Sequence, residues 1–306
     1  MFSHNSNQMA GGRVKQLALG LGLMALLLAP LSAAAQDTNY TFETLIFPGD
    51  TFTQLLGINN SGTIAGYHGA TINKGFTLVP PHSFTLENFP PSAQTQVIGI
   101  NSAGWTDGFY IDQEGNTHGF MDEVSALYAP FRTVTYPGTT FNQLLGLNDE
   151  NQAAGYYQDA AGNDHAYVYD ENGGVFLLIN IPGSVSAQAT GINNSGEVCG
   201  FYIDKAGVNH GFLLNAGNFT KLDFPEATFT QALGLNNKQQ VVGFYMDAAG
   251  LTHGFVYSNG VFEPVDDPNG IGTTTINGTN DLGQIVGFYV DSNGNTDGLL
   301  GTPVAP

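Results

Sequence analysis

The 306-residue chain has one cysteine, one tryptophan and only seven lysine and arginine residues. A single cysteine, Cys199, excludes an internal disulfide, so the fold has to be held together by buried apolar surface. Small apolar residues fill most positions equivalent to Cys199 in the repeat described below, with Asp107 as the exception, and we interpret the thiol as a core filler. With 42% hydrophobic residues, the chain can build a large core.

The scarcity of basic residues gives the chain a formal net charge of −19. Two of the basic residues, Arg13 and Lys15, lie in the first 35 residues, which contain no acidic residue, so the remainder carries 5 − 26 = −21. Nucleic acids and anionic membranes are bound by clustered lysine and arginine. We therefore expect no nucleic acid and no membrane surface as a partner, whereas cations, neutral glycans and basic proteins remain compatible with this charge.

Long apolar runs are also missing, except for one near the N-terminus. Residues 17–31 follow Arg13 and Lys15, and Ala33 and Ala35 supply the small residues of a cleavage site before Gln36. The run is shorter than the roughly 20 residues that span a bilayer. We predict a signal peptide over residues 1–35, rather than a membrane anchor, and a protein secreted to the periplasm or the medium.

The rest of the chain consists of a block of about 44 residues that recurs six times. Aligned on a G-x-N triplet, the units begin at Gly57, Gly99, Gly146, Gly191, Gly234 and Gly278, at intervals of 42, 47, 45, 43 and 44 residues. Helical periodicity is absent, and each unit divides into four short candidate strands. In the fourth unit these are residues 187–193, 197–204, 208–215 and 219–224.

The turns between these strands predict their register. Asp204 to Gly207 has the Asn/Asp-x-x-Gly pattern of a three-residue hairpin loop. The expected cross-strand pairs are Tyr202 with His210, Phe201 with Gly211 and Gly200 with Phe212, and in the second unit Tyr110 with His118, Phe109 with Gly119 and Gly108 with Phe120. Aromatic rings that cover cross-strand glycines support such a sheet, so the repeated aromatic and glycine triplets are interpreted as packing.

Four antiparallel strands per unit are typical of a propeller blade. We predict an all-β, six-bladed β-propeller over residues 36–306. Residues 40–47 resemble a fourth strand, and a third strand at 296–300 comes near the C-terminus. The N-terminal strand should therefore complete the last blade and close the ring. An open β-solenoid is the alternative fold.

The fourth unit reads GINNSGEVCG from Gly191 to Gly200 and continues to His210-Gly211-Phe212. This pattern resembles the HAF repeat family of bacterial extracellular proteins, whose motif is roughly G-I-N-x-x-G-x-V-V-G followed by G-x-x-H-A-F. The resemblance extends over all six units, although the first and last have Lys74 and Asp297 in place of the histidine. It implies export and a repeat architecture, and it carries no established activity.

Two sets of polar residues recur in step with the repeat. Four units place a histidine at the same point, namely His118, His165, His210 and His253. Metal ligation would need these side chains to converge, whereas blades splay outward, so we interpret each as the cross-strand partner of a tyrosine. Five units open the turn between the second and third strands with an aspartate, namely Asp112, Asp159, Asp204, Asp247 and Asp291.

Turn chemistry explains these aspartates, because their side chains bond to the backbone of their own turn. The same turns share a face of a propeller with the connections that enter each next blade. The five carboxylates would then rim a binding face and attract a hard cation such as Ca²⁺. This acidic rim is the one metal-site hypothesis from the sequence, and no other cofactor is predicted.

An active site is not six-fold, so catalysis should break the repeat. The visible breaks are Trp105, an insert at residues 122–128, and the departures of the first and last units. None pairs a nucleophile with a base, so no catalytic residue is predicted. We interpret Asp122 and Glu123 as acids of a solvated loop. Trp105 replaces Thr, Gln or Glu of the sister units and is expected near solvent, as edge packing or as a platform for a sugar ring.

The function that these observations favour is a secreted, monomeric, non-enzymatic binding or surface-interaction module. Its ligand would be a carbohydrate, an envelope component or another protein. The alternatives are a propeller hydrolase of glycans or lactones and a scaffold protein without a small ligand, because one propeller fold hosts many functions. Three or more convergent, non-repeating polar side chains at the channel mouth would favour an enzyme.

Overall fold

A computed structural model describes residues 39–123 and 131–304. The predicted signal peptide with its cleavage site, and the part of the insert after Glu123, lie outside the described residues. Every regular element in the described residues is a β-strand. No helix in this part of the chain is long and apolar enough to cross a bilayer.

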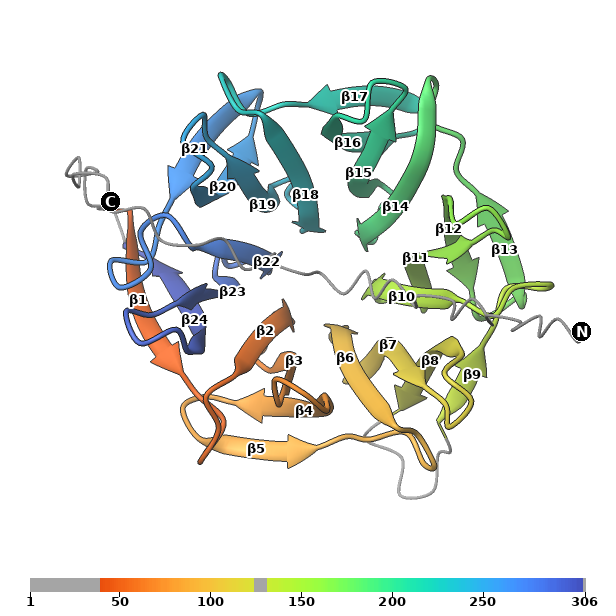
Figure 1. Cartoon of the computed structure of the whole chain (residues 1–306), viewed down its shortest axis with the longest axis horizontal. Coiled ribbons are helices and arrows are strands. Elements are labelled where there is room, and N and C mark those ends of the chain that lie inside the picture. Colours follow the sequence, from red (N-terminus) through yellow and green to blue (C-terminus); the bar gives the residue numbers. More distant parts are fainter. Residues whose placement is uncertain (1–38, 124–130, 305–306) are drawn as a thin grey trace, which may run out of the picture. The chain divides into compact units, whose positions relative to one another are not determined.

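Six antiparallel sheets of four strands each surround a central axis (Figure 1). In the first five sheets the strands follow the chain order from the axis outwards. This arrangement is a six-bladed β-propeller, as predicted, and the solenoid alternative is wrong.

The strands of the six blades have the following bounds. Blade 1 comprises β2 (Thr53–Ile58), β3 (Ile64–His68), β4 (Lys74–Val79) and β5 (Ser83–Leu86); blade 2 comprises β6 (Gln94–Ile100), β7 (Trp105–Ile111), β8 (Thr117–Glu123) and β9 (Arg132–Val134). Blade 3 comprises β10 (Asn142–Leu147), β11 (Gln152–Gln158), β12 (Asp164–Asp170) and β13 (Val175–Leu178); blade 4 comprises β14 (Ser184–Ile192), β15 (Val198–Asp204), β16 (Asn209–Asn215) and β17 (Asn218–Leu222). Blade 5 comprises β18 (Phe229–Leu235), β19 (Val241–Met246), β20 (Thr252–Ser258) and β21 (Val261–Val265); blade 6 comprises β22 (Thr275–Thr279), β23 (Ile285–Val290), β24 (Thr296–Pro303) and β1 (Tyr40–Leu45).

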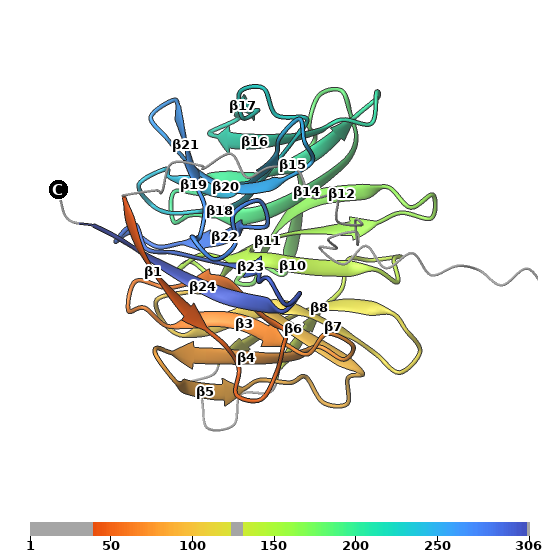
Figure 2. The same ribbon diagram turned by 60° about the vertical axis from the view of Figure 1, so that its left-hand side comes forward.

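Blade 6 joins the two ends of the described chain. Strand β1 pairs antiparallel with β24, with Tyr40 opposite Pro303 and Leu45 opposite Gly298 (Figures 1 and 2). The predicted closure of the ring by the N-terminal strand is therefore confirmed. Strand β24 extends past the predicted end at residue 300, because β1 provides a ladder for it up to Pro303.

The predicted hairpin register is also confirmed. In blade 4, Gly200 lies opposite Phe212 and Tyr202 lies opposite His210. The pairs expected in blade 2 are found as well. A Cβ atom added to Gly200 would lie 2.8 Å from the ring of Phe212, so the aromatic ring covers the glycine as expected.

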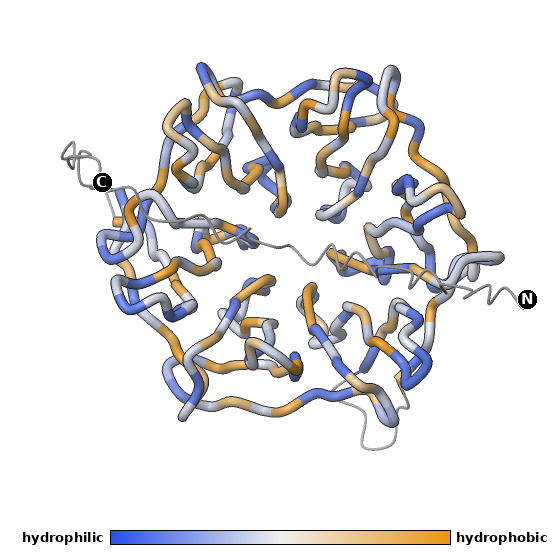
Figure 3. Tube along the Cα trace, viewed as in Figure 1, coloured by the Kyte–Doolittle hydropathy of each residue, from blue (hydrophilic) through white to orange (hydrophobic). Residues whose placement is uncertain are grey.

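The core lies between neighbouring blades. Blades 1 to 5 bury one aromatic side chain completely on the third strand, namely Phe76, Phe120, Tyr167, Phe212 and Phe255. Cys199 is also fully buried, in a cluster with Leu235 and Phe255 of the next blade, which confirms its role as a core filler. Figure 3 shows apolar and polar residues interspersed along every blade.

The ring has two faces, which we name by their residues. The asparagine face carries the turn between the first and second strands of each blade, where each G-x-N triplet ends, and also the turn between the third and fourth strands. The aspartate face carries the turn between the second and third strands and the connections into the next blade. Backbone hydrogen bonds such as Thr252 N to Gly272 O, 3.0 Å, tie these turns to the connections.

Candidate functional sites

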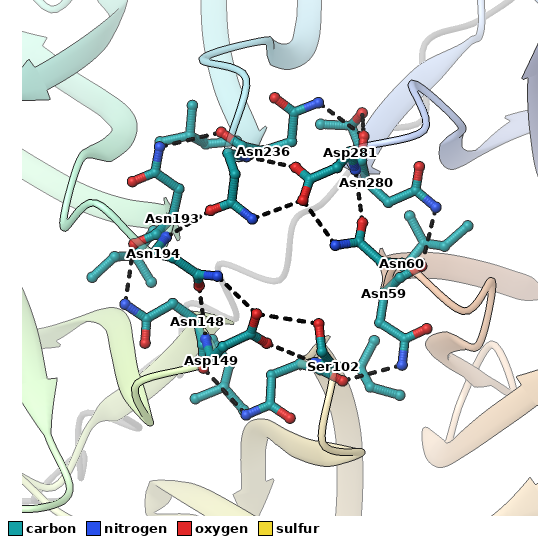
Figure 4. A pocket seen from close by; sticks show the side chains of 18 residues that line it. Asn59, Asn60, Ser102, Asn148, Asp149, Asn193, Asn194, Asn236, Asn280 and Asp281 are labelled. Carbon is teal, nitrogen blue, oxygen red and sulfur yellow. Dashed lines mark hydrogen bonds between the residues drawn. The ribbon is translucent and has the colours of Figure 1, made fainter.

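The asparagine of each G-x-N triplet ties its blade to the next one. These residues are Asn59, Asn101, Asn148, Asn193, Asn236 and Asn280. Each Oδ1 accepts two hydrogen bonds from backbone amides of its own turn, as Asn148 does from the amides of Glu150 and Gln152 at 3.0 and 2.9 Å. Each Nδ2 donates to the backbone carbonyl oxygen of the equivalent asparagine in the next blade, at 2.8–3.2 Å (Figure 4). An aspartate has no such donor, which explains why the position is asparagine in every unit.

The glycine of the triplet lets the innermost strands approach one another. A Cβ atom added to Gly146 would lie 2.7 Å from the carbonyl oxygen of Thr190 and 3.1 Å from the Cα atom of Gly191 in the next blade. The other five glycines of the triplets have similarly close backbone or side-chain neighbours. Because any side chain here would separate the strands, the glycines set the narrow width of the channel.

A second polar ring follows the first on the asparagine face. Its members are Asn60, Ser102, Asp149, Asn194, Asn237 and Asp281 (Figure 4). At five of the six seams between blades, the backbone N–H of one member donates to a side-chain oxygen of the next, at 2.7–2.9 Å. Among the described residues, no such bond joins Asn60 to Ser102. Burial opposes ionisation of Asp281, but hydrogen bonds from Asn237 and Asn60 outweigh it and lower the pKa of this carboxyl.

These two rings surround a cavity of about 70 Å³ at the channel mouth. The cavity has room for ordered water and is too small for a sugar ring. Its polar side chains stand at the same position in every blade and hydrogen bond to one another. By the criterion stated above, the mouth therefore lacks the non-repeating polar cluster that would favour an enzyme.

The predicted acidic rim lies on the aspartate face, and its carboxylates are engaged in their own turns. In Asp112, Oδ1 accepts from the backbone amides of Glu114 and Asn116 at 3.0 and 2.8 Å, and Oδ2 accepts from the side chain of Asn116. Burial works against ionisation, but these bonds and the one with His118 lower the pKa of Asp112 to about 2. Asp159, Asp204, Asp247 and Asp291 accept the same pair of backbone bonds. Turn chemistry thus accounts for all five, and calcium binding by this rim remains an untested prediction.

Each of the four repeated histidines lies opposite a tyrosine across the hairpin, as predicted. The ring centroids of the four Tyr–His pairs are 4.9–5.2 Å apart. The sequence did not indicate their carboxylate partners: Nδ1 of His253 lies 2.7 Å from Asp266, and Nδ1 of His210 lies 2.8 Å from Asp223. Within residues 39–123 and 131–304, no three His, Cys, Asp or Glu side chains are placed to hold a metal ion.

Trp105 lies at the junction of blades 2 and 3 and is partly exposed, as expected. The guanidinium carbon of Arg132 is 5.2 Å from the centroid of the indole, so the arginine covers the ring that we expected as a sugar platform. Arg132 also pairs with Glu171 of blade 3. The pKa of Tyr169 is raised to about 12, mainly by burial and to a lesser extent by the contact with Glu171. These four side chains form a cluster on the asparagine face, which we call the Trp105 site.

The expectation of a solvated loop at Asp122 is wrong. Asp122 belongs to β8, pairs with Thr106 and is 9% exposed. Glu87, which sequence reasoning missed, is 5% exposed and accepts a hydrogen bond from Thr106. The signal that would have revealed it is the repeat itself, because the equivalent positions in the other blades are all aliphatic, namely Leu45, Val134, Ile179, Leu222 and Val265.

No protein-family model and no curated protein matches this sequence. Solved structures do match by their fold. A TolB protein from Agrobacterium tumefaciens has a TM-score of 0.60 at 10% identity, over 87% of this chain and 99% of that one. A fungal lectin from Aleuria aurantia, described as a six-bladed β-propeller with a fucose recognition mode, has a TM-score of 0.53 at 8% identity, over 82% and 93% of the two chains.

The match to TolB from Acinetobacter baumannii is shorter. It covers 69% of this chain and only 54% of that protein, with a TM-score of 0.53 and 11% identity. Identities this low show a shared fold alone. The comparisons therefore support a propeller, and the chemistry has to be argued from the residues of this chain.

Proposed function

We propose that this protein is an exported, non-enzymatic module that binds neutral glycans at the Trp105 site. The observation that carries the proposal is the stack of Arg132 on Trp105, with Glu171 paired to the guanidinium. The described chain has no other tryptophan or arginine, and both side chains meet at a break in the repeat. The predicted leader and the HAF-like repeat support export.

The chemistry of the Trp105 site suits a sugar with neighbouring hydroxyl groups. A guanidinium offers five N–H donors in a plane, and a carboxylate offers acceptors only. Together they can satisfy both the oxygen and the hydrogen of a hydroxyl group. Half of the Arg132 side chain is exposed, so N–H donors remain open to solvent, while the guanidinium carbon lies 5.2 Å from the centroid of the indole.

A neutral ligand fits this protein better than an anionic one. The chain after residue 35 carries 5 − 26 = −21 formal charges, which repels uronic or sialic acids at long range. Arg132 is the one cation of the Trp105 site, and Glu171 already balances its charge. The structural similarity to a fucose-recognising lectin supports a glycan as the ligand class.

A glycan array probed with residues 36–306 tests this proposal. We expect binding to neutral hexose-containing glycans. The substitution Trp105→Gln introduces the residue of three sister units. It should raise the dissociation constant at least about tenfold, which is a loss of about 1.4 kcal/mol of binding free energy. Arg132→Thr, which also restores a sister residue, should have a similar effect. Both variants are expected to keep the fold, because three sister blades have Gln at the position of Trp105 and two have Thr at that of Arg132.

Lys221→Thr provides the matched control, because it removes an exposed base on the outer strand of blade 4 that is paired with Asp223. Its glycan affinity should equal that of the unmodified protein. Absence of binding to any neutral glycan overturns the proposal, as does equal loss of affinity in Lys221→Thr. Release of free sugar or opened lactone during the assay would support the hydrolase alternative instead.

A further inference from the structure

Blade 2 differs from its five sisters in its core as well as at Trp105. Besides Glu87, which contacts blade 2 from the end of blade 1, two positions that are apolar in every other blade are polar here. The position of Thr106 is filled elsewhere by Ile64, Ala153, Val198, Val241 and Ile285, and that of Asp107 by Ala65, Ala154, Cys199, Val242 and Val286. Asp122 replaces a leucine or tyrosine of four sister blades. Two carboxyl groups, those of Asp107 and Asp122, therefore occupy core positions of blade 2, and a third, that of Glu87, contacts blade 2 from the end of blade 1.

These carboxyl groups are buried with few hydrogen-bond donors. Glu87 lies on the connection that leaves blade 1, and its Oε1 accepts from Thr106 of blade 2, so this contact crosses the seam between the two blades. Asp107 is fully buried on the opposite side of β7, where Oδ1 accepts from the backbone N–H of Gly99 at 2.8 Å. The second oxygen of Glu87 and that of Asp107 are buried without a partner. A buried, unpaired carboxylate oxygen strongly disfavours the charged form.

No positive charge compensates these three groups. The charged groups that act on Glu87 are Asp122 and Asp107, and Asp122 in turn faces Glu123. Asp107 faces the buried Tyr167 of blade 3.

The basic side chains on the surrounding strands are engaged elsewhere or exposed. His118 of β8 contacts Asp112 and Thr135, and Arg132 of β9 pairs with Glu171. Lys74 at the start of β4 is exposed, and His68 of β3 bonds to Asp50.

Among the described residues, the seam between blades 1 and 2 also has one hydrogen bond fewer in the second polar ring of the asparagine face than the other five seams. A cavity of about 290 Å³ opens between Thr63 and Thr77 of blade 1 and Ile100 and Ser102 of blade 2. Charges that form at this seam could therefore be hydrated by a small separation of the two blades.

We propose that blade 2 is a proton-dependent element. It packs against its neighbours when the buried carboxyl groups of Asp107, Asp122 and, across the seam with blade 1, Glu87 are protonated, and it loosens, first at that seam, when they ionise. This inference does not depend on the glycan-binding function. It assigns to the fold a loss of stability as the pH rises towards 8, localised at blade 2 and its seam with blade 1.

The direction of the pH dependence follows from linkage. Burial, with repulsion from Asp122 and Asp107, raises the pKa of Glu87 to about 8. Burial raises the pKa of Asp107 to about 7 and also raises that of Asp122. Because the unfolded chain ionises near the ordinary values of 4.5 and 3.8, the contribution of these groups is present below those values. It is lost progressively as the pH rises, until the folded groups ionise near pH 8.

The only tryptophan of the chain, Trp105, begins β7 at the junction of blades 2 and 3, so its emission reports whether the loosening extends through blade 2. We expect the melting temperature of residues 36–306 to fall by roughly 5–10 °C between pH 5.5 and pH 9. The Trp105 emission should shift towards that of exposed indole over the same range, before global unfolding. A variant with the residues of sister blades, Glu87→Leu with Asp107→Val and Asp122→Leu, should lose most of both changes.

Glu197→Gln is the matched control, because Glu197 is also buried but both of its oxygens accept hydrogen bonds from amide side chains. This variant should keep the pH response of the unmodified protein. An unchanged response in the triple variant overturns the proposal, and so does an equal reduction in Glu197→Gln. If the triple variant fails to fold, the single variant Glu87→Leu is compared with Glu197→Gln by the same two readouts, with the same outcomes deciding.

Discussion

The side-chain amide of Asn280 donates a hydrogen bond to the backbone carbonyl oxygen of Asn59, 3.0 Å away and 221 residues earlier in the chain. This bond joins blade 6 to blade 1 and is the last of six identical links around the axis. The same asparagine organises its own turn through Oδ1. One residue per blade therefore serves both a local turn and the closure of the ring.

The first prediction concerns this ring. Asn148→Asp keeps the oxygen that accepts the turn amides but replaces the donor to the carbonyl of Asn193 by an acceptor. We expect the free energy of unfolding to fall by about 1–3 kcal/mol, because a buried carbonyl loses its partner. Urea denaturation measures the change. Asn172→Asp removes the same kind of bond, to the carbonyl of Glu150, at an exposed site, and a comparable loss there would contradict the explanation.

The second prediction concerns the width of the channel. Gly146→Ala places a Cβ atom 2.7 Å from the carbonyl oxygen of Thr190, and both atoms belong to strands that cannot move independently. Overpacking of this kind typically costs about 1–3 kcal/mol. Thermal unfolding of the variant should show a lower midpoint. Gly173→Ala, where the nearest neighbour is a side-chain atom of Val175 at 3.4 Å, is the control and should change stability by less than about 0.5 kcal/mol.

Much of this fold could be predicted because the sequence states the same pattern six times. The turn that begins at Asp204 determines, through its length and residue types alone, that Tyr202 lies opposite His210. The turn and this pairing were both predicted correctly. The link from Asn148 to the carbonyl of Asn193 could not be predicted, because it joins residues 45 positions apart whose proximity depends on the assembled ring.

The misinterpretation of Asp122 has a different cause. Adjacent acids before an insert are typical of a loop, and no local rule places an unpaired carboxyl group in a strand. Comparison with Leu78 and Leu214 in the equivalent positions shows that a core position was involved. Departures from the repeat were thus informative only when they were compared position by position, as with Glu87 and Trp105.

The third prediction concerns the closure of the ring by β1. Leu45 is 2% exposed and packs with Leu55 and Phe76 of blade 1 and with Val286 of blade 6. Leu45→Ala should lower the free energy of unfolding by about 2–5 kcal/mol, because it leaves a cavity where the last blade meets the first. Glu43→Ala, on the same strand but exposed, should be nearly neutral. Equal effects of the two substitutions in chemical denaturation would show that β1 does not hold the ring.

The fourth prediction concerns His253, whose Nδ1 lies 2.7 Å from Asp266. The hydrogen bond with Asp266 raises the pKa of His253 above its ordinary value of 6.5, although burial opposes this. The protonated histidine therefore stabilises the fold fully below about pH 6.5, and the contribution is lost as the pH rises through the raised pKa. Asp266→Asn should bring the pKa of His253 down, as measured by NMR titration of the imidazole. The destabilisation by this variant should also be larger at pH 5.5 than at pH 8.5.

The control for this measurement is Glu263→Gln, which removes an exposed carboxylate from the same strand as Val265 without touching the imidazole. This variant should leave the pKa of His253 unchanged. If Asp266→Asn also leaves the titration unchanged, Asp266 does not hold the proton on this histidine. The stack of His253 on Tyr245, with ring centroids 5.2 Å apart, would then be a purely apolar contact that needs no charge on the imidazole.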